Sequence, residues 1–231
     1  MQTITVASRK GGSGKTTMAS ELCVEAARQG AGRVCFVDLD PMLGLTKWWE
    51  ARTAETPERL EVHAGGLTAT LPELKQRGYA LLIIDTPPAA DPVVAEAIRA
   101  ADLVLVPVQP SPHDLRAIPE TIGLVELLGK PMVFVINGAR KRAVLTGEAA
   151  KLLSQHGTVA TPSIHRAEAF PQAAVTGETV FEREPSSGPA AEIRALWLYL
   201  AGRLARQQGS TLPVPPTAQP HRKATVRVLG S

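Results

Sequence analysis

The stretch "SRKGGSGKTT", from Ser8 to Thr17, directly follows a short apolar run at the start of the chain. It nearly matches the pattern G-x-x-x-x-G-K-[ST], in which a glycine-rich loop cradles phosphate groups. Counting back from Gly14, the first glycine of the pattern should stand at position 9, where the chain has Arg9. A second lysine, Lys10, lies inside the loop. The question is whether the loop has lost its phosphate-binding function or is a phosphate-binding loop of a different type.

The loop contains the residue types that a chain of phosphates needs. Glycines allow the backbone to fold into an anion-binding nest, and the N–H groups at the start of the following helix point to the same place. We expect Lys15 to reach the β- and γ-phosphates, Thr16 to offer its hydroxyl to Mg²⁺, and Thr17 to lie near the α-phosphate. The nucleotide-binding residues predicted in this loop are Gly11, Gly12, Ser13, Gly14, Lys15, Thr16 and Thr17.

Acidic residues end two other apolar runs. "LLIIDTPP" places Asp85 where a strand end commonly holds Mg²⁺ through water, and "VDLDP" contains Asp38 and Asp40. Two carboxylates two residues apart in an extended chain face the same side, and such like charges are costly without a cation nearby. We therefore expect Asp38, Asp85 and Thr16 around a magnesium ion and Asp40 to orient the attacking water. The alternative for each run is a solvated turn.

Short β-branched runs alternate with helical stretches along the chain. The expected strands cover 3–8, 33–40, 60–65, 79–88, 103–110, 131–137 and 158–164, and the expected helices 15–29, 45–53, 68–77, 91–101, 115–128, 144–155 and 189–207. This alternation predicts an α/β fold with a doubly wound, mainly parallel sheet and helices on both faces. Ligands bind beyond the carboxyl ends of such strands, where the polar clusters above would meet.

The charge of the chain is unevenly distributed. The 231 residues have a formal net charge of +3, and residues 209–231 contain Arg222, Lys223 and Arg227 without an acidic residue, so residues 1–208 are neutral. The last stretch also contains four prolines, which disfavour helix. We expect one domain over 1–208 and a disordered, Pro-rich basic tail over 209–231. The tail is either solvated or a weak arm for nucleic acid or a partner.

Cysteines and apolar runs indicate the compartment. Cys23 and Cys35 lie in apolar contexts with a spacing that no metal motif uses, so we expect both as reduced core residues. No apolar run approaches the ~18–20 residues that a membrane span needs. These features predict a cytoplasmic protein without a membrane partner.

Taken together, "KGGSGKTT", "VDLDP" and "IIDTPP" resemble the deviant Walker A ATPases of the ParA/MinD family, which have the P-loop NTPase fold. The resemblance extends to about Arg206. In that family the first glycine of the loop pattern is normally absent, as it is at Arg9. A second lysine in the loop, here Lys10, is the signature of the family. The resemblance implies slow hydrolysis of ATP to ADP and phosphate, with ATP and Mg²⁺ as cofactors and Lys10, Lys15 and Asp40 as catalytic residues. Lys10 would bind the ATP of the partner subunit in an ATP-bound homodimer, which couples hydrolysis to dimerisation.

Other segments also resemble the family. They are "LTKWWEAR", "VPVQPSPHDLRA", whose following helix lies at the dimer face in relatives, and "PSIHRAEAFPQAAVTGETVFE". Asn137, which closes "VFVIN", matches a position that can read the adenine edge. The resemblance therefore adds Asn137 and Lys10 to the nucleotide-binding residues.

Several members of the family are compatible with these motifs. The favoured reading is a small ParA-type partition ATPase without an N-terminal helix-turn-helix, which binds DNA non-specifically, associates with the nucleoid, and is stimulated by a small centromere-binding adaptor (ParB/ParG-like). The alternative is a ParA-like ATPase that positions another cargo, such as a protein complex or conjugative DNA. A MinD-like membrane protein is disfavoured because the tail has no Phe or Trp. A reductase would need paired cysteines.

DNA contacts must come from local basic patches, because the body of the chain is neutral. Arg166 and Arg194 lie in segments that resemble DNA-contacting segments of relatives. The "RKR" run is either a DNA contact or a solvated loop. The DNA-binding candidates are Arg140, Lys141, Arg142, Arg166, Arg194, Arg203 and Arg206.

Overall fold

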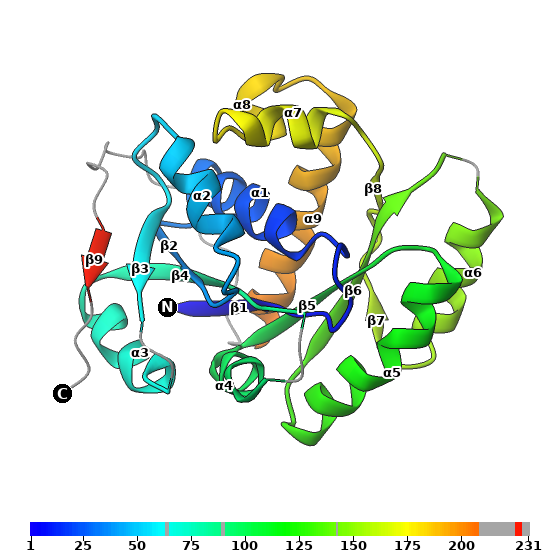
Figure 1. Cartoon of the computed structure of the whole chain (residues 1–231), viewed down its shortest axis with the longest axis horizontal. Helices are drawn as coiled ribbons and strands as arrows, with labels where there is room; N and C mark the ends of the chain where they lie inside the picture. The colour runs from blue at the N-terminus through cyan, green and yellow to red at the C-terminus, as the bar shows by residue number, and fades with distance from the viewer. Residues whose placement is uncertain (63–64, 89–90, 142, 208–224, 228–231) are drawn as a thin grey trace.

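The computed structural model describes residues 1–62, 65–88, 91–141, 143–207 and 225–227 (Figure 1). Within them, nine strands form a sheet in the order β7-β6-β5-β1-β4-β2-β3-β9, and β8 pairs with β6 off this path. Every pairing is parallel, which confirms the expected sheet. The strands are β1 (Gln2–Val6), β2 (Arg33–Asp38), β3 (Glu58–Glu61), β4 (Tyr79–Asp85), β5 (Leu103–Val108), β6 (Met132–Ala139), β7 (Thr158–Val159), β8 (Ile164–His165) and β9 (Thr225–Arg227).

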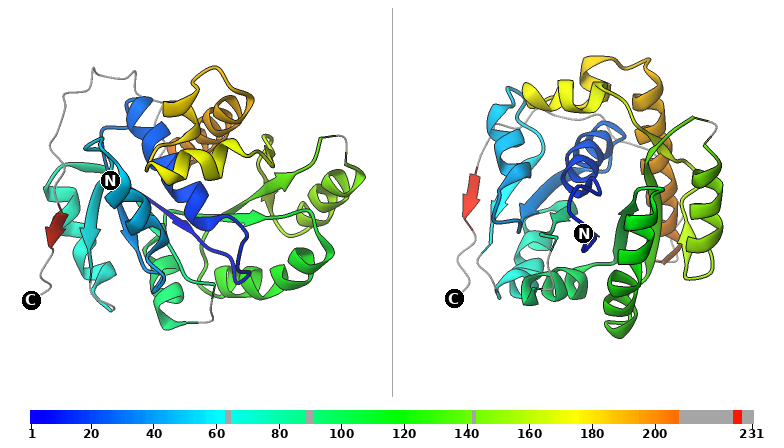
Figure 2. Two further views of the ribbon diagram at one scale, coloured as in Figure 1. Left: turned by 45° about the horizontal axis from the view of Figure 1, so that its top comes forward. Right: turned by 45° about the vertical axis from the view of Figure 1, so that its right-hand side comes forward.

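Helices cover both faces of the sheet. In Figures 1 and 2, α1, α2, α7, α8 and α9 lie on one face and α3, α4, α5 and α6 on the other. The described helices are α1 (Lys15–Arg28), α2 (Gly44–Ala51), α3 (Leu67–Gln76), α4 (Pro92–Ala100), α5 (Pro112–Leu127), α6 (Val144–Leu153), α7 (Ala169–Val175), α8 (Val180–Arg183) and α9 (Gly188–Gln207). None of the helices in the described part of the chain has the length and apolarity to span a bilayer.

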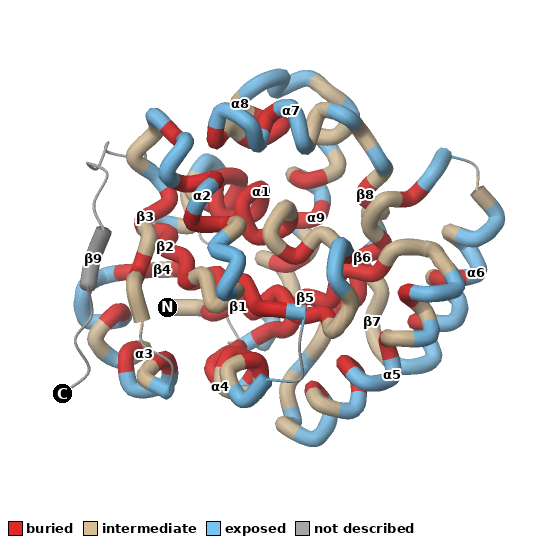
Figure 3. Tube along the Cα trace, in the orientation of Figure 1, coloured by how far each residue is buried: buried red, intermediate tan, exposed pale blue. Residues whose placement is uncertain are grey.

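The middle of the sheet is buried on both sides, as Figure 3 shows. In β4, Leu81 and Ile83 pack into the core under α1 and α9, while Leu82 and Ile84 pack into the core under α3. Successive side chains of a strand point to opposite faces, so a strand between two helix layers must be apolar at every position. Each such side chain contributes about 1.5–3 kcal/mol when it is fully buried. The continuous apolar run therefore fixes β4 in the centre.

The strand order brings the polar strand ends together. β1 lies between β4 and β5, and in the sheet register Val6 pairs with Asp85, which in turn pairs with Asp38. The chain leaves β1 into the glycine-rich loop and leaves β2 toward Asp40. All of these groups consequently lie at the carboxyl edge of the sheet.

The segment "LTKWWEAR" connects α2 to the layer that α7 and α8 form. The buried Arg52 contacts Glu182 at 2.7 Å and donates to the carbonyl oxygen of Gly177 at 2.6 Å. The indole of Trp48 donates to the carbonyl oxygen of Glu178 at 3.0 Å. Breaking a buried ion pair by removing one partner typically costs ~3–5 kcal/mol. This segment therefore has a structural role that holds α2 against α8.

Three parts of the chain differ from the sequence-based expectation. The single strand expected over 158–164 is two short strands, β7 and β8, because Pro162 between them has no N–H to donate to β6. The short helices α7 and α8 were not expected. Thr225–Arg227, inside the tail expected to be disordered, pair with the outer edge of β3. The other tail residues lie outside the described part of the chain. Cys23 and Cys35 are free and buried, as expected.

Candidate active site

The loop between β1 and α1 has the backbone conformation of an anion-binding nest. Gly12 and Gly14 have φ angles of 76° and 95°, in the left-handed region that favours glycine. A Cβ atom on Gly14 would also collide with the side-chain nitrogen of Asn137. The loop borders a cavity of about 320 Å³. Its lining residues are Gly11, Gly12, Gly14, Lys15, Thr16, Thr17, Asp40 and Pro88.

Lys15, the first residue of α1, is buried at this cavity. Its Nζ donates to the carbonyl oxygen of Lys10 at 3.3 Å. Burial lowers the pKa of Lys15, while the nearby carboxylates of Asp85 and Asp40 raise it in part. A partly desolvated ammonium interacts more strongly with phosphate than an exposed one. Lys15 is therefore suited to hold a phosphate chain.

Thr16 and Asp85 form a pair that fits a divalent cation. The Thr16 hydroxyl donates to Oδ2 of Asp85 at 2.6 Å. Oδ1 of Asp85 is buried and has no hydrogen-bond partner among the described residues. Burial raises the pKa of Asp85 to about 7, although the Thr16 hydrogen bond lowers it. A bound cation would satisfy the orphaned oxygen and favour the carboxylate.

Magnesium would not be held by side chains alone. Among the described residues, no cluster of three or more His, Cys, Asp or Glu could hold a metal ion. Mg²⁺ commonly keeps several waters and binds through one or two protein groups together with substrate phosphates. The Thr16 hydroxyl and the Asp85 carboxylate are groups of this kind.

The two aspartates after β2 have different surroundings. Asp38 accepts from the backbone N–H of Asp40 at 3.1 Å and from that of Thr46 at 2.8 Å. Asp40 accepts from the N–H of Met42 at 2.9 Å and lines the phosphate cavity. Asp38 therefore holds the turn into α2 with both carboxylate oxygens, whereas Asp40 presents its carboxylate to the cavity.

Two side-chain amides contact the loop from the ends of β5 and β6. Nδ2 of Asn137 donates to the carbonyl oxygen of Ser13 at 2.7 Å, and Nε2 of Gln109 donates to that of Gly12 at 2.7 Å. The sequence analysis did not identify Gln109, because its contact with Gly12 joins residues 97 positions apart. A second cavity of about 370 Å³ adjoins the loop. Its lining residues are Gly12, Gly14, Thr17, Gln109, Asn137, Gly138, His165, Arg166, Ala167, Glu168, Phe170 and Pro171.

This second cavity has room for a base beside the phosphate loop. Asn137, which is predicted to contact adenine, borders this cavity. Its side-chain N–H₂ group also donates to the carbonyl oxygen of Ser13. An amide nitrogen has two hydrogens, so the second N–H and the amide oxygen of Asn137 remain for an adenine contact. Two further loop residues were predicted to bind the nucleotide. The hydroxyl of Ser13 is buried and has no hydrogen-bond partner among the described residues. Lys10 is half-buried.

The match of a family model decides the identity of the chain. The model for the CobQ/CobB/MinD/ParA nucleotide-binding domain matches residues 4–180. The chain belongs to this family. It is thus a nucleotide-binding ATPase of the ParA/MinD type, as its motifs predicted.

Named relatives of this ParA/MinD-type ATPase have different cargoes. Maintenance of carboxysome distribution protein A from Halothiobacillus neapolitanus is 31% identical over 189 residues, which are 78% of this chain and 87% of that protein. The chromosome-partitioning ATPase Soj from Thermus thermophilus is 33% identical over 152 residues, 53% of this chain and 61% of that protein. The structure of apo McdA from Cyanothece superimposes with a TM-score of 0.70 at 21% identity, covering 85% of this chain and 99% of that one. This structural likeness shows the fold.

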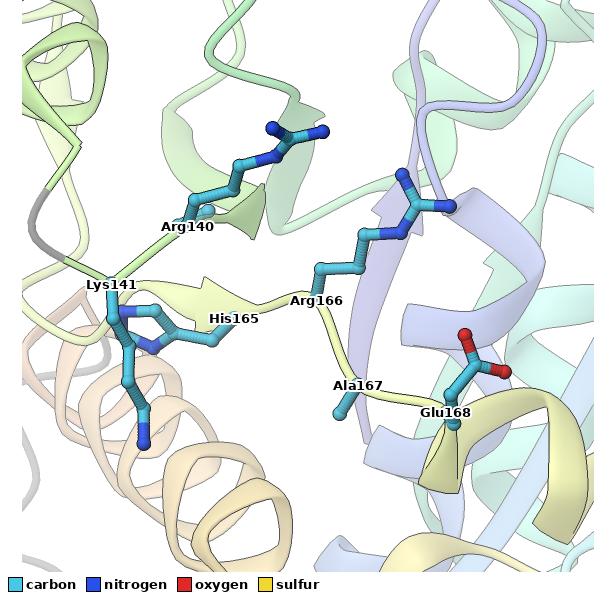
Figure 4. A pocket seen from close by; sticks show the side chains of 7 residues that line it. Arg140, Lys141, His165, Arg166, Ala167 and Glu168 are labelled. Carbon is cyan, nitrogen blue, oxygen red and sulfur yellow. The ribbon is translucent and has the colours of Figure 1, made fainter.

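The DNA-binding candidates of this ParA/MinD-type ATPase lie in more than one place. Arg140, Lys141 and Arg166 border a cavity of about 350 Å³ with His165 and Glu168. In Figure 4, the guanidinium groups of Arg140 and Arg166 point to the same side, whereas Lys141 points the other way. Arg142 lies outside the described residues. Arg140 and Arg166 therefore form the pair that the structure brings together.

Arg194 is partly exposed and also contacts neighbouring helices. Its Nε lies 3.4 Å from Oε1 of the buried Glu25, and its guanidinium lies 5.0 Å from the ring centre of Phe181. These contacts connect α9 to α1 and α8, so Arg194 has a structural role that its sequence segment did not reveal. Arg203 and Arg206 lie toward the C-terminal end of α9.

Proposed function

We propose that this ATPase positions a large protein cargo on nucleoid DNA. The observation that carries the proposal is the match to a carboxysome distribution protein over 87% of that protein's length. The match to the partitioning ATPase Soj spans 61% of Soj and about half of this chain. Sequence reasoning favoured DNA segregation and kept another cargo as the alternative. The comparisons support the alternative better.

In the proposed cycle, two copies bind ATP with Mg²⁺ and associate as a homodimer. Lys15 holds the β- and γ-phosphates, Thr16 and Asp85 hold the cation, and Asp38 fixes the turn that carries Asp40. The cation supplies charge neutralisation on the phosphates. Asp40 orients the attacking water at the cavity. Lys10 of each copy neutralises charge on the nucleotide of the other, so that hydrolysis releases the dimer.

We further propose that the dimer binds DNA through phosphate contacts and that a small adaptor on the cargo stimulates hydrolysis. Phosphate contacts carry no base information, so this binding is independent of DNA sequence. A dimer doubles each basic patch, which couples DNA affinity to ATP through multivalency. Arg140 and Arg166 are the leading contacts, because their guanidinium groups point to the same side and no ion pair within the described residues neutralises them.

Arg166→Glu is expected to weaken DNA binding by the ATP-bound protein roughly 10-fold and to lower the salt slope by about 1–2, because a cation facing phosphate is lost from each subunit. Mobility shifts with ATP or ADP at several salt concentrations measure this effect. Lys75→Glu, at an exposed lysine on α3, is the matched control. Unchanged DNA binding by Arg166→Glu would remove this patch from the interface. Arg194→Glu is a poor probe, because its new carboxylate would face Glu25.

DNA segregation is the second candidate, and the Soj match is the observation that favours it. Deletion of the gene in its own host separates the two functions. Loss of even spacing of a fluorescently tagged protein compartment, with unchanged inheritance of plasmids and chromosome, is expected for cargo positioning. Increased loss of a replicon with normal compartment spacing would instead establish segregation. The wild-type gene is expected to restore the normal phenotype, and the Lys15→Ala gene is not. This difference would show that either phenotype depends on the ATPase activity.

A further inference from the structure

Two neighbouring strands each deliver one amide to the phosphate loop. Val108 of β5 pairs in register with Ile136 of β6, so the residues that follow them, Gln109 and Asn137, lie side by side. Gln109 donates to the carbonyl oxygen of Gly12 and Asn137 to the next carbonyl along the chain. Consecutive peptide groups of the loop are therefore held from the same side.

The orientation of a carbonyl group fixes the orientation of an N–H group. A trans peptide is planar, and its C=O and N–H point in opposite directions. The Gly12 carbonyl shares its peptide with the N–H of Ser13, so the hydrogen bond from Gln109 turns that N–H away from β5. Glycines at positive φ have other conformations within reach, and an unanchored loop would sample them. With the hydrogen bond from Gln109 in place, the Ser13 N–H keeps one orientation, so the loop need not rearrange when a phosphate binds.

Gln109 lies beside Gly138 of β6, and its amide is held by the hydrogen bond to Gly12. Gly138, with a φ of 69°, lies beside the side chain, and a Cβ atom built there would lie 3.7 Å from Cγ of Gln109. A side chain at position 138 would thus touch the stem of Gln109, whose amide donates to the carbonyl oxygen of Gly12 at 2.7 Å.

We propose that Gln109 is a positioning residue for phosphate binding. Its amide fixes the Gly12–Ser13 peptide so that the Ser13 N–H faces the β-phosphate of the bound nucleotide. Gln109 acts through the loop rather than by contact with the phosphate. The proposal rests on the nucleotide-binding ATPase activity of the family and is independent of the cargo and of DNA.

The test compares nucleotides with and without a β-phosphate. Gln109→Leu keeps the approximate size of the side chain but removes the donor. Its affinity for Mg-ADP is expected to fall about 5- to 10-fold, the usual worth of one net hydrogen bond, while its affinity for AMP changes less than about twofold. Gln109→Glu is expected to lose more affinity for Mg-ADP than Gln109→Leu, because its carboxylate would face the Gly12 carbonyl. Isothermal titration calorimetry measures both nucleotides for each protein.

Controls separate positioning from folding. Gln155→Leu, at an exposed glutamine after α6, is expected to bind both nucleotides like the wild type. The nucleotide-free Tm of the Gln109 variants is expected to stay within a few degrees of the wild type. Mg-ADP affinity within twofold of wild type in both Gln109 variants would overturn the proposal. Equal losses for ADP and AMP would also overturn it, because Gln109 would then shape the base cavity.

Discussion

Lys15→Ala is expected to reduce ATP binding at least ~100-fold, to below detection in most assays. Lys15 is buried at the phosphate cavity, and burial lowers its pKa while Asp85 and Asp40 favour the charged form. Hydrogen bonds to charged groups contribute ~1.5–3 kcal/mol each, and an ammonium that serves two phosphates makes at least two of them. Equilibrium titration with a fluorescent ATP analogue measures the loss.

Lys47→Ala provides the control for Lys15, because Lys47 is an exposed lysine on the neighbouring helix α2. It is expected to bind ATP like the wild type. Removal of Lys15 also removes a desolvated charge, so we expect the nucleotide-free Tm to change little. Wild-type ATP affinity in Lys15→Ala would show that the nucleotide binds away from this loop.

Asp40→Ala is expected to lower ATP hydrolysis ~100-fold and to leave ATP binding intact. Asp40 presents its carboxylate to the phosphate cavity, where orienting a water typically contributes ~10²–10⁴-fold. Because hydrolysis is proposed to release the dimer, the variant should accumulate as an ATP-bound dimer that still binds DNA. Phosphate release and light scattering after size exclusion measure the two effects.

Asp40→Asn distinguishes catalysis from loop structure. The asparagine oxygen can still accept from the N–H of Met42, which Asp40 does at 2.9 Å. The neutral amide can still accept a hydrogen bond from water, but it lacks the negative charge that makes a carboxylate the stronger acceptor. Equal losses of hydrolysis in both variants support the catalytic role. A variant that remains monomeric with ATP, or Asp40→Asn with wild-type turnover, would contradict it.

The sequence predicts the fold and the centre of the site because both depend on short-range patterns. Buried apolar runs such as "YALLIID" require two covering layers, and the spacing within "GGSGKTT" places Lys15 and Thr16 at the start of α1. The contact between Thr16 and Asp85 then follows from neighbouring strands that end at one edge.

Other features depend on tertiary packing, which a local pattern does not contain. Arg194 is predicted as a DNA contact from its segment, and its ion pair with Glu25 arises only because α9 packs against α1. Gln109 looked like an ordinary residue after a strand until the fold brought it to Gly12. The four residues of α8 have no amphipathic period to detect, and a capping box between Thr179 and Glu182 stabilises them.

The burial of both cysteines makes this chain convenient for site-specific labelling. Cys23 and Cys35 have no exposed surface, and burial raises the pKa of both thiols, so neither presents a reactive thiolate at neutral pH. A cysteine introduced on the outer surface of α6 would then be the thiol that a maleimide dye modifies. Fluorophores could follow single subunits on DNA without first removing the native cysteines.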